Sequence, residues 1–297
     1  MLNGEKILVT GVTGKAVLPI AASLAKTNEV WGMARFSDPA QRAEVEAAGI
    51  RPIAVDLNAP DFDVVPTNFT RLLHFAWMRA DLSQLDTAIR VNVEAAGQLL
   101  MHCRNAKSAF VASGMGIYSP HSDPWHRFSE TDPIGRAFTA YAPTSPASKL
   151  GLESVARFCA RAFNLPVTIG RLNTVMGPRG TYFDKLIDAA RAGEEFMVPN
   201  DPNPHGPIHT EDMQEQIHAL TLEASTPALI VNWCGDENVT SQQAAAQLER
   251  LTGVKSRLKI VNFPGAPLGN ATDNALRLSI TGPCKTTFEE TFGRLCK

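Results

Sequence analysis

The chain has 297 residues, of which 44% are hydrophobic and only 20% charged, and its formal net charge is −2. This composition supplies one large core with a smaller lobe, and no basic run indicates nucleic acid or an anionic membrane as a partner. No apolar run approaches the roughly 20 residues that span a bilayer. We therefore expect a cytoplasmic protein that acts on a small molecule.

The cysteines and histidines show no metal-ligand spacing and no Cys-x-x-Cys motif, so we expect no metal site. The cysteines are odd in number and widely scattered, which predicts reduced, structural thiols. They are Cys103, Cys159, Cys234, Cys284 and Cys296.

Apolar strand-like runs alternate with helical patterns over the first 172 residues. This alternation predicts an α/β fold with a doubly wound parallel sheet of the Rossmann type. The expected strands lie near 6–10, 29–34, 51–55, 71–76, 108–113 and 166–172, and the expected helices near 15–26, 39–48, 82–105 and 146–164.

The pattern becomes mixed after residue 172. We expect residues 1–172 to form a dinucleotide-binding domain and 173–297 mostly a small C-terminal substrate lobe, with 228–252 returning to the Rossmann domain. The expected elements are helices near 181–193, 210–224 and 241–252, a strand at 228–233 and a loop rich in Pro and Asn at 199–207.

The first strand leads into Thr10-Gly-Val-Thr-Gly14. Gly11 and Gly14 let the backbone approach a pyrophosphate, Thr13 lies between them, and the N-terminus of the next helix faces the phosphates. Val17 stands where a full fingerprint has a third glycine, so we expect the helix to pack slightly farther from the strand. This turn predicts a dinucleotide site.

Arg35 follows the second strand, where an NAD-binding protein places a carboxylate for the ribose hydroxyls. A guanidinium can hold a 2′-phosphate in bidentate fashion. We therefore predict NADP(H) as the cofactor.

Later strand ends add candidates, because ligands of such sheets bind beyond the carboxyl ends of the strands. Asp56-Leu57 follows the third strand, and the carboxylate either accepts the adenine amino group or is a solvated turn residue. Ala76 is small enough for main chain to approach a ribose, and Trp77 would overlook the site.

Taken in order, these residues resemble the extended short-chain dehydrogenase/reductase family, which includes NAD(P)-dependent epimerases and dehydratases. The resemblance runs nearly the full length and implies a Rossmann domain, a small C-terminal lobe and hydride transfer at the nicotinamide C4. The further motifs that carry it are Asn92-Val93, Ser113 to Tyr118, Ser148-Lys149 with Glu153, Arg171 to Pro178 including Asn173, Ile208 to Asp212, and Asn232 with Gly235 ahead of Val239-Thr240.

The resemblance implies that Lys149 holds the nicotinamide ribose and that Asn173 helps to set the hydride geometry. Members of the family place a tyrosine four residues before the lysine, and its phenol acts as the acid. Here Ser145 occupies that position, and an aliphatic hydroxyl is a much poorer acid. The family serine falls at Gly114, which leaves Ser113 one place too early.

Several groups remain as substitutes for the tyrosine. Ser145 before Pro146 also reads as an N-cap, an interpretation that we prefer for it. Tyr141 could swing its phenol toward the nicotinamide, and His126 is a further candidate acid. His209 matches a family histidine that is more often structural than catalytic.

The sequence says less about the substrate than about the cofactor. In nucleotide-sugar members, an arginine four residues before the equivalent of His209 grips the diphosphate, and this chain has His205 there, so a sugar nucleotide is disfavoured. A pocket for a small carbonyl compound could be lined by Trp77, Trp125, Phe128 and Phe183.

These observations predict an NADP(H)-dependent oxidoreductase for a small, fairly apolar carbonyl or alcohol, with a non-standard proton donor. One alternative is a catalytically decayed NADP(H)-binding sensor. Another is a redox-neutral lyase, isomerase or dehydratase that uses bound nucleotide. In similar proteins, the helices near 82–105 and 146–164 often pair into a homodimer.

Overall fold

The computed structural model describes residues 1–138, 142–177, 180–261 and 263–297. The chain forms two compact units. The first consists of Met1–Gly114, Ala142–Arg171 and Gln214–Val231, and the second of Met115–Tyr141, Leu172–Met213 and Asn232–Lys297. No helix in the described ranges is long and apolar enough to cross a membrane.

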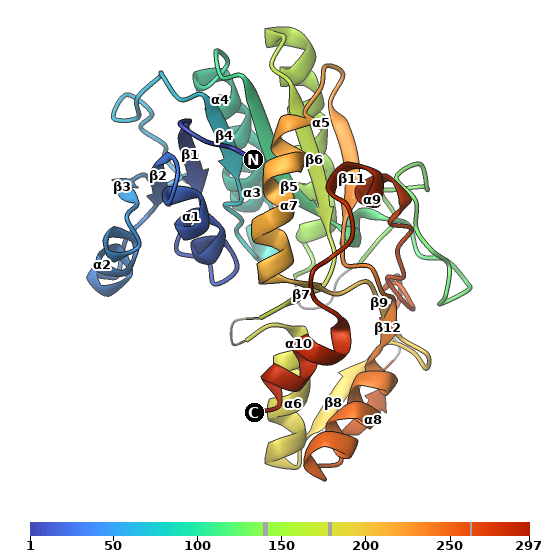
Figure 1. Cartoon of the computed structure of the whole chain (residues 1–297). Helices are drawn as coiled ribbons and strands as arrows, with labels where there is room; N and C mark the ends of the chain where they lie inside the picture. The colour runs from blue at the N-terminus through green and yellow to red at the C-terminus, as the bar shows by residue number, and fades with distance from the viewer. Residues whose placement is uncertain (139–141, 178–179, 262) are drawn as a thin grey trace. The chain divides into compact units, whose positions relative to one another are not determined.

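A seven-stranded sheet runs through the first unit in the order β11-β6-β5-β4-β1-β2-β3, and helices cover both of its faces (Figure 1). The β1–β2, β2–β3, β1–β4 and β4–β5 pairs are parallel. The predicted doubly wound Rossmann fold is confirmed. The strands are β1 (Lys6–Thr10), β2 (Glu29–Ala34), β3 (Arg51–Ala54), β4 (Arg71–His74), β5 (Ser108–Gly114), β6 (Val167–Leu172) and β11 (Leu229–Trp233).

Helices of this unit follow the apolar periodicity of the sequence. A large core joins α4 and α5 to the sheet, through buried side chains such as Leu72, Leu99 and Leu152. The helices are α1 (Val17–Ala25), α2 (Pro39–Ala47), α3 (Leu85–Ile89), α4 (Ala95–His102), α5 (Ser145–Phe163) and α7 (Thr210–Leu222), whose first turn belongs to the second unit.

The predicted long helix at 82–105 is divided. It starts with a 3-10 turn at Leu82–Gln84 and has a π-helical turn at Arg90–Glu94 between α3 and α4. Asn92 lies buried in the π turn, where its side chain accepts the N–H of Met78 at 2.8 Å and donates to the Met78 carbonyl at 2.9 Å. The turn therefore fixes the loop that follows β4.

Among its described residues, the second unit has three two-stranded sheets and a core of its own. Phe183 packs edge-to-face on Phe288 and Phe292. Its strand pairs are β7 (Val175–Met176) with β10 (Ile208–His209), β9 (Pro204–His205) with β12 (Val239–Thr240), and β8 (Glu195–Val198) with β13 (Arg257–Ile260). Its other helices are α6 (Tyr182–Ala192), α8 (Ser241–Thr252), α9 (Ala275–Thr281) and α10 (Phe288–Leu295), and a 3-10 turn spans Met115–Ile117.

One segment of the first unit ends at Arg171, next to the expected boundary at residue 172, and other segments are divided differently from the expectation. Residues 115–138 belong to the second unit. Of the segment 228–252, expected to return to the Rossmann domain, only the part up to Val231 lies in the first unit. The reason is packing, because Ala244 and Leu248 of α8 are part of the core that contains Phe183.

Candidate active site

The glycine turn after β1 is packed tightly against the end of β4. Gly11 has a φ of +67°, and a Cβ atom there would lie 2.9 Å from the Cα and N atoms of Ala76. Only glycine fits both the backbone conformation and this close approach. The N–H of Gly14 donates to the Gly11 carbonyl at 2.9 Å, and the Gly14 carbonyl accepts from Val17, where α1 begins.

Thr10 fixes the other side of this contact. Its hydroxyl oxygen accepts the N–H groups of Phe75 and Ala76, each at 3.1 Å. The hydroxyl proton therefore points at His74 Nδ1, 3.0 Å away, which assigns the imidazole proton to Nε2. Burial, helped by the positive charge of Lys149, lowers the pKa of His74 to about 4, so the ring is neutral at physiological pH.

Arg35 directly follows β2 and is exposed. No carboxylate in the described parts of the chain pairs with its guanidinium. The next residue, Phe36, has a φ of +50°, and Asp38 then caps α2 by accepting the Ala40 N–H at 2.9 Å. The turn thus leaves the Arg35 guanidinium available to an anion.

Asp56 lies exposed beyond β3, and its Oδ1 accepts the N–H of Asn58 at 2.9 Å. This bond is that of an ordinary turn aspartate, and the second carboxylate oxygen remains for a ligand. Leu57 is buried and belongs to the core of the first unit.

Lys149 lies on α5 and reaches the end of β5. Its ammonium donates to the Ala112 carbonyl at 3.0 Å and lies 3.8 Å from the centre of the Trp77 ring. Glu153, one turn later, is bound by Arg171 through two hydrogen bonds of 3.0 and 2.9 Å. Burial lowers the pKa of Lys149 to about 7; the negative charge of Glu153 opposes this shift, and the positive charge of Arg79 adds to it.

Ser145, at the position of the family tyrosine, is the first residue of α5. The N-cap is Thr144, which makes no side-chain cap bond, so the prediction that Ser145 caps the helix was wrong by one position. Thr144 instead donates its hydroxyl proton to the Ala80 carbonyl at 2.9 Å. This bond ties the start of α5 to the loop after β4.

The remaining candidate acids are placed differently. Ser113 lies at the end of β5 with its Oγ buried and without a hydrogen-bond partner among the described residues. Gly114 beside it carries no hydroxyl. Tyr141 lies outside the described residues, so it stays a prediction.

His126 and Asn173 belong to the second unit. His126 stacks on His121 with ring centres 4.0 Å apart, and its Nε2 lies 3.1 Å from Asp132 Oδ1. Asn173 donates to the Asn270 carbonyl at 2.8 Å and to the Thr272 hydroxyl at 2.6 Å. The amide nitrogen of Asn173 is thus used within the protein, and the role of His126 as an acid stays a prediction.

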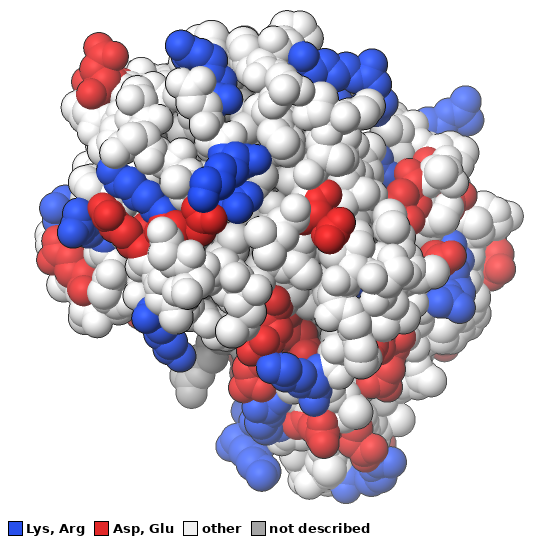
Figure 2. All heavy atoms as spheres, turned by 45° about the horizontal axis from the view of Figure 1, so that its top comes forward, with Lys and Arg blue, Asp and Glu red and all other residues white. Residues whose placement is uncertain are grey.

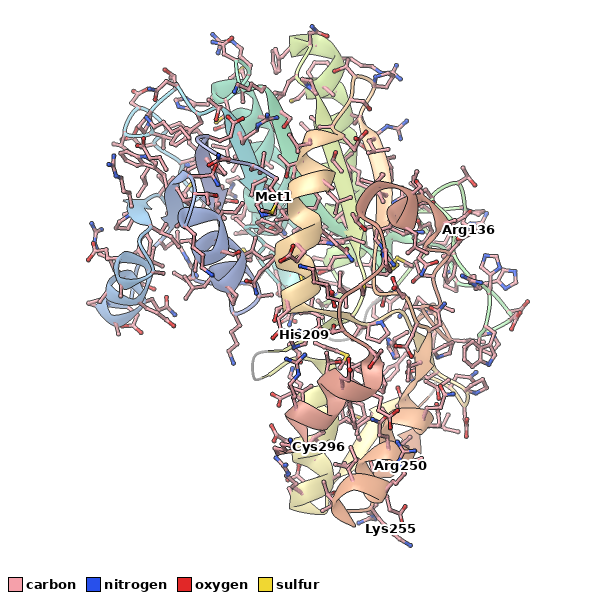
Figure 3. All side chains as sticks on the ribbon, viewed as in Figure 1. Met1, Arg136, His209, Arg250, Lys255 and Cys296 are labelled. Atoms are coloured by element: carbon pink, nitrogen blue, oxygen red, sulfur yellow. The ribbon has the colours of Figure 1, made fainter. Side chains whose placement is uncertain are left out.

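His205 and His209 are also in the second unit, where His209 stands immediately before α7 (Figure 3). His209 Nδ1 accepts the Glu211 N–H at 3.2 Å, which fits the structural role expected of it. His205 is buried between Thr174 Oγ1 at 3.0 Å and Asn203 Oδ1 at 2.9 Å. Burial lowers the pKa of His205 to about 4, so it is neutral at physiological pH.

Sequence reasoning located the strand ends but missed two roles. It did not find the Thr10–His74 bond, although two polar residues at the ends of neighbouring apolar strands were a usable signal. It placed Trp77 over the site but did not pair it with Lys149, because that contact joins residues 72 positions apart.

The sequence model of the NAD-dependent epimerase/dehydratase family matches residues 7–228. The chain belongs to this family. The resemblance drawn from the motifs is thereby confirmed, and the turn at Gly11 and the lysine on α5 lie in the matched region. No curated protein sequence matches the chain.

Solved structures share the fold over almost the whole chain. UDP-glucuronic acid 4-epimerase from Bacillus cereus, in complex with UDP-glucuronic acid and NAD, is 19% identical, with a TM-score of 0.81 and 98% of both chains covered. UDP-glucose 4-epimerase from Thermus thermophilus, in complex with NAD, is 20% identical, with a TM-score of 0.79, and 98% of this chain and 97% of that chain are covered. UDP-N-acetylglucosamine 4-epimerase from Methanobrevibacter ruminantium, in complex with UDP-N-acetylmuramic acid, is 16% identical, with a TM-score of 0.83, and 99% of this chain and 98% of that chain are covered.

Proposed function

We propose that the protein is an NADP(H)-dependent oxidoreductase that acts on a small, fairly apolar carbonyl compound or alcohol. The observation that carries the proposal is the exposed Arg35 guanidinium, which directly follows β2, the strand beside β1, and pairs with no carboxylate among the described residues. A guanidinium binds a phosphate through two charge-assisted hydrogen bonds. Two of the three solved structures named above are in complex with NAD, so the proposed preference differs from the cofactor bound there.

The described residues fit a dinucleotide. A side chain at position 11 would collide with the backbone of Ala76. A glycine at this position also allows the main chain to approach a pyrophosphate closely. When bound, the dinucleotide supplies or accepts a hydride at its nicotinamide ring. Lys149 would hold the nicotinamide ribose, and Asp56 would accept a hydrogen bond from the adenine.

His205 supports a substrate without a diphosphate. The family arginine that grips the diphosphate of a sugar nucleotide is replaced by this histidine, which is buried, neutral and held by Thr174 and Asn203. A neutral ring engaged at both nitrogens has no charge or free donor for a diphosphate. On the face in Figure 2, acidic and basic side chains are interspersed rather than gathered into one basic surface.

The test is oxidation of NADPH and, in parallel, NADH, followed at 340 nm against a panel of aldehydes, ketones, quinones and enones. The proposal expects oxidation of NADPH well above that of NADH. In Arg35→Ala, the ratio of the two kcat/KM values should fall by about 10- to 100-fold, since a hydrogen bond to a charged group contributes about 1.5–3 kcal/mol. The matched control is Arg42→Ala on α2, which removes an exposed guanidinium already paired with Glu46 and should leave the ratio unchanged.

Ser145 replaces the family tyrosine and Gly114 replaces the family serine, and this double replacement favours a second candidate, a dinucleotide-binding sensor without turnover. Intact NADPH affinity without oxidation of any panel compound would support it. The epimerase relatives favour a third candidate, a redox-neutral enzyme, which would form product without net consumption of NADPH.

A further inference from the structure

The ammonium of Lys149, a partly buried residue, has an unusual set of neighbours. One N–H donates to the Ala112 carbonyl at 3.0 Å, and the face of the Trp77 ring lies 3.8 Å away. No carboxylate among the described residues forms an ion pair with it. An ammonium has three N–H groups. One donates to the carbonyl and one can point at the ring, so at least one remains for a ligand.

Charged or titratable groups near Lys149 come from α5, β4, β6 and the loop after β4. Glu153 on α5 is held in a buried ion pair by Arg171 on β6, and its negative charge favours the protonated form of Lys149. His74 on β4 is neutral, and Arg79 in the following loop is positive. Burial is the main cause that holds the pKa of Lys149 at about 7, far below the ordinary range of lysine; the negative charge of Glu153 opposes it, and the positive charge of Arg79 adds to it.

The position of this amine matters because the usual acid is missing. Lys149 lies one helical turn after Ser145, which replaces the family tyrosine, so both residues lie on the same side of α5. We propose that Lys149 is itself the catalytic acid and base, in place of that tyrosine. The inference rests on the proposed oxidoreductase function.

In the reduction, the reduced nicotinamide would supply the hydride by losing a C–H bond at C4 and would be oxidised. The hydride forms a C–H bond at the carbonyl carbon of the substrate, which is reduced, while the C=O π bond breaks. The electron pair of that bond moves to the oxygen, which takes a proton from Nζ of Lys149. The alcohol leaves, and the neutral amine regains a proton from water. In the oxidation, the neutral amine removes the hydroxyl proton, so a group that titrates near neutrality serves both directions.

Trp77 has a defined part in this arrangement. The π face of an indole attracts a cation and screens it from water without accepting its proton. Replacement by leucine keeps an apolar neighbour but removes that attraction. The Trp77→Leu variant should therefore titrate at a pH lower by roughly 0.5 to 1.5 units.

The first test titrates Lys149 directly in protein without dinucleotide. Protein labelled with 13C at the lysine Cε is followed by NMR over pH 5.5–11, and the signal absent from Lys149→Arg identifies the residue. We expect a midpoint near pH 7 for this signal, far below the ordinary lysine value of about 10.4. A midpoint above about 9.5 would overturn the proposal whatever the activity.

The second test separates proton transfer from binding. Arginine keeps the positive charge but does not release a proton, so Lys149→Arg should retain NADPH affinity within about fivefold and lose at least about 100-fold in kcat. For the wild type, kcat/KM of carbonyl reduction should fall tenfold per pH unit above pH 7. Lys26→Arg on the surface should match the wild type in both respects.

Two outcomes distinguish failure of this inference from failure of the proposed function. Wild-type turnover that persists in Lys149→Arg but is lost in Tyr141→Phe would overturn this inference and leave the proposed function intact. An absence of NADPH oxidation in the wild type, over the whole panel, would overturn the proposed function and this inference with it.

Discussion

The geometry of the candidate site depends on the three hydrogen bonds of the Thr10 hydroxyl. It accepts two backbone N–H groups and donates to His74, and Thr10 is fully buried. Thr10→Val keeps the shape and removes all three bonds. Each buried amide left unsatisfied costs about 1–3 kcal/mol, so we expect the free energy of unfolding to fall by about 2–5 kcal/mol.

The chain offers a matched control in Thr168 on β6. This threonine is also fully buried, but its hydroxyl has no hydrogen-bond partner among the described residues. Thr168→Val should therefore unfold within about 0.5 kcal/mol of the wild type, or be slightly more stable. The two substitutions are the same chemical change, so they differ only in the bonds that are lost.

The assay is urea unfolding followed by tryptophan fluorescence, with NADPH binding measured on both variants below the transition. The account expects a lower midpoint and weaker NADPH binding for Thr10→Val alone, because the end of β4 would no longer be held against the Gly11 turn. Equal midpoints for the two variants, or an equal loss in both, would refute the reasoning.

Two further substitutions test the turn and the buried ion pair. Gly11→Ala should abolish measurable dinucleotide binding. The control Gly49→Ala has a φ of +77° but open space at its Cβ position, so this variant should bind the dinucleotide normally. Equal binding by the two variants would show that the close approach of Gly11 to Ala76 is unimportant. Glu153→Gln leaves the Arg171 guanidinium buried without its charged partner and should lower the unfolding free energy by about 3–5 kcal/mol. Glu46→Gln in an exposed pair should cost under about 1 kcal/mol, and urea titration that ranks the two equally would contradict this explanation.

The strands and the glycine turn of the first unit could be predicted because the sequence patterns that indicate them are local. Each strand from β1 to β6 is a short apolar run bounded by turn residues, and the glycine turn follows the first run directly. The break in the 82–105 helix was not predictable, since the π turn at Asn92 depends on a bond to Met78, which lies in another loop. The start of α5 was wrong by only one residue.

The second unit was less predictable for the same physical reason. Strands β8 and β13 pair across about 60 residues of sequence, and each is too short to show a clear alternation of apolar and polar residues. At the site, the residue types at the strand ends were readable from the sequence. The contact of Lys149 with Trp77 and the low pKa of its amine depend on tertiary packing and needed coordinates.

The most direct measurement is the dissociation constant of the purified protein for NADPH and for NADH under identical conditions, by calorimetry, in the wild type and in Arg35→Ala. The account predicts that the wild type binds NADPH at least about tenfold more tightly than NADH and that Arg35→Ala removes this difference. Equal affinities in the wild type, tighter binding of NADH, or a preference for NADPH that survives Arg35→Ala would contradict it.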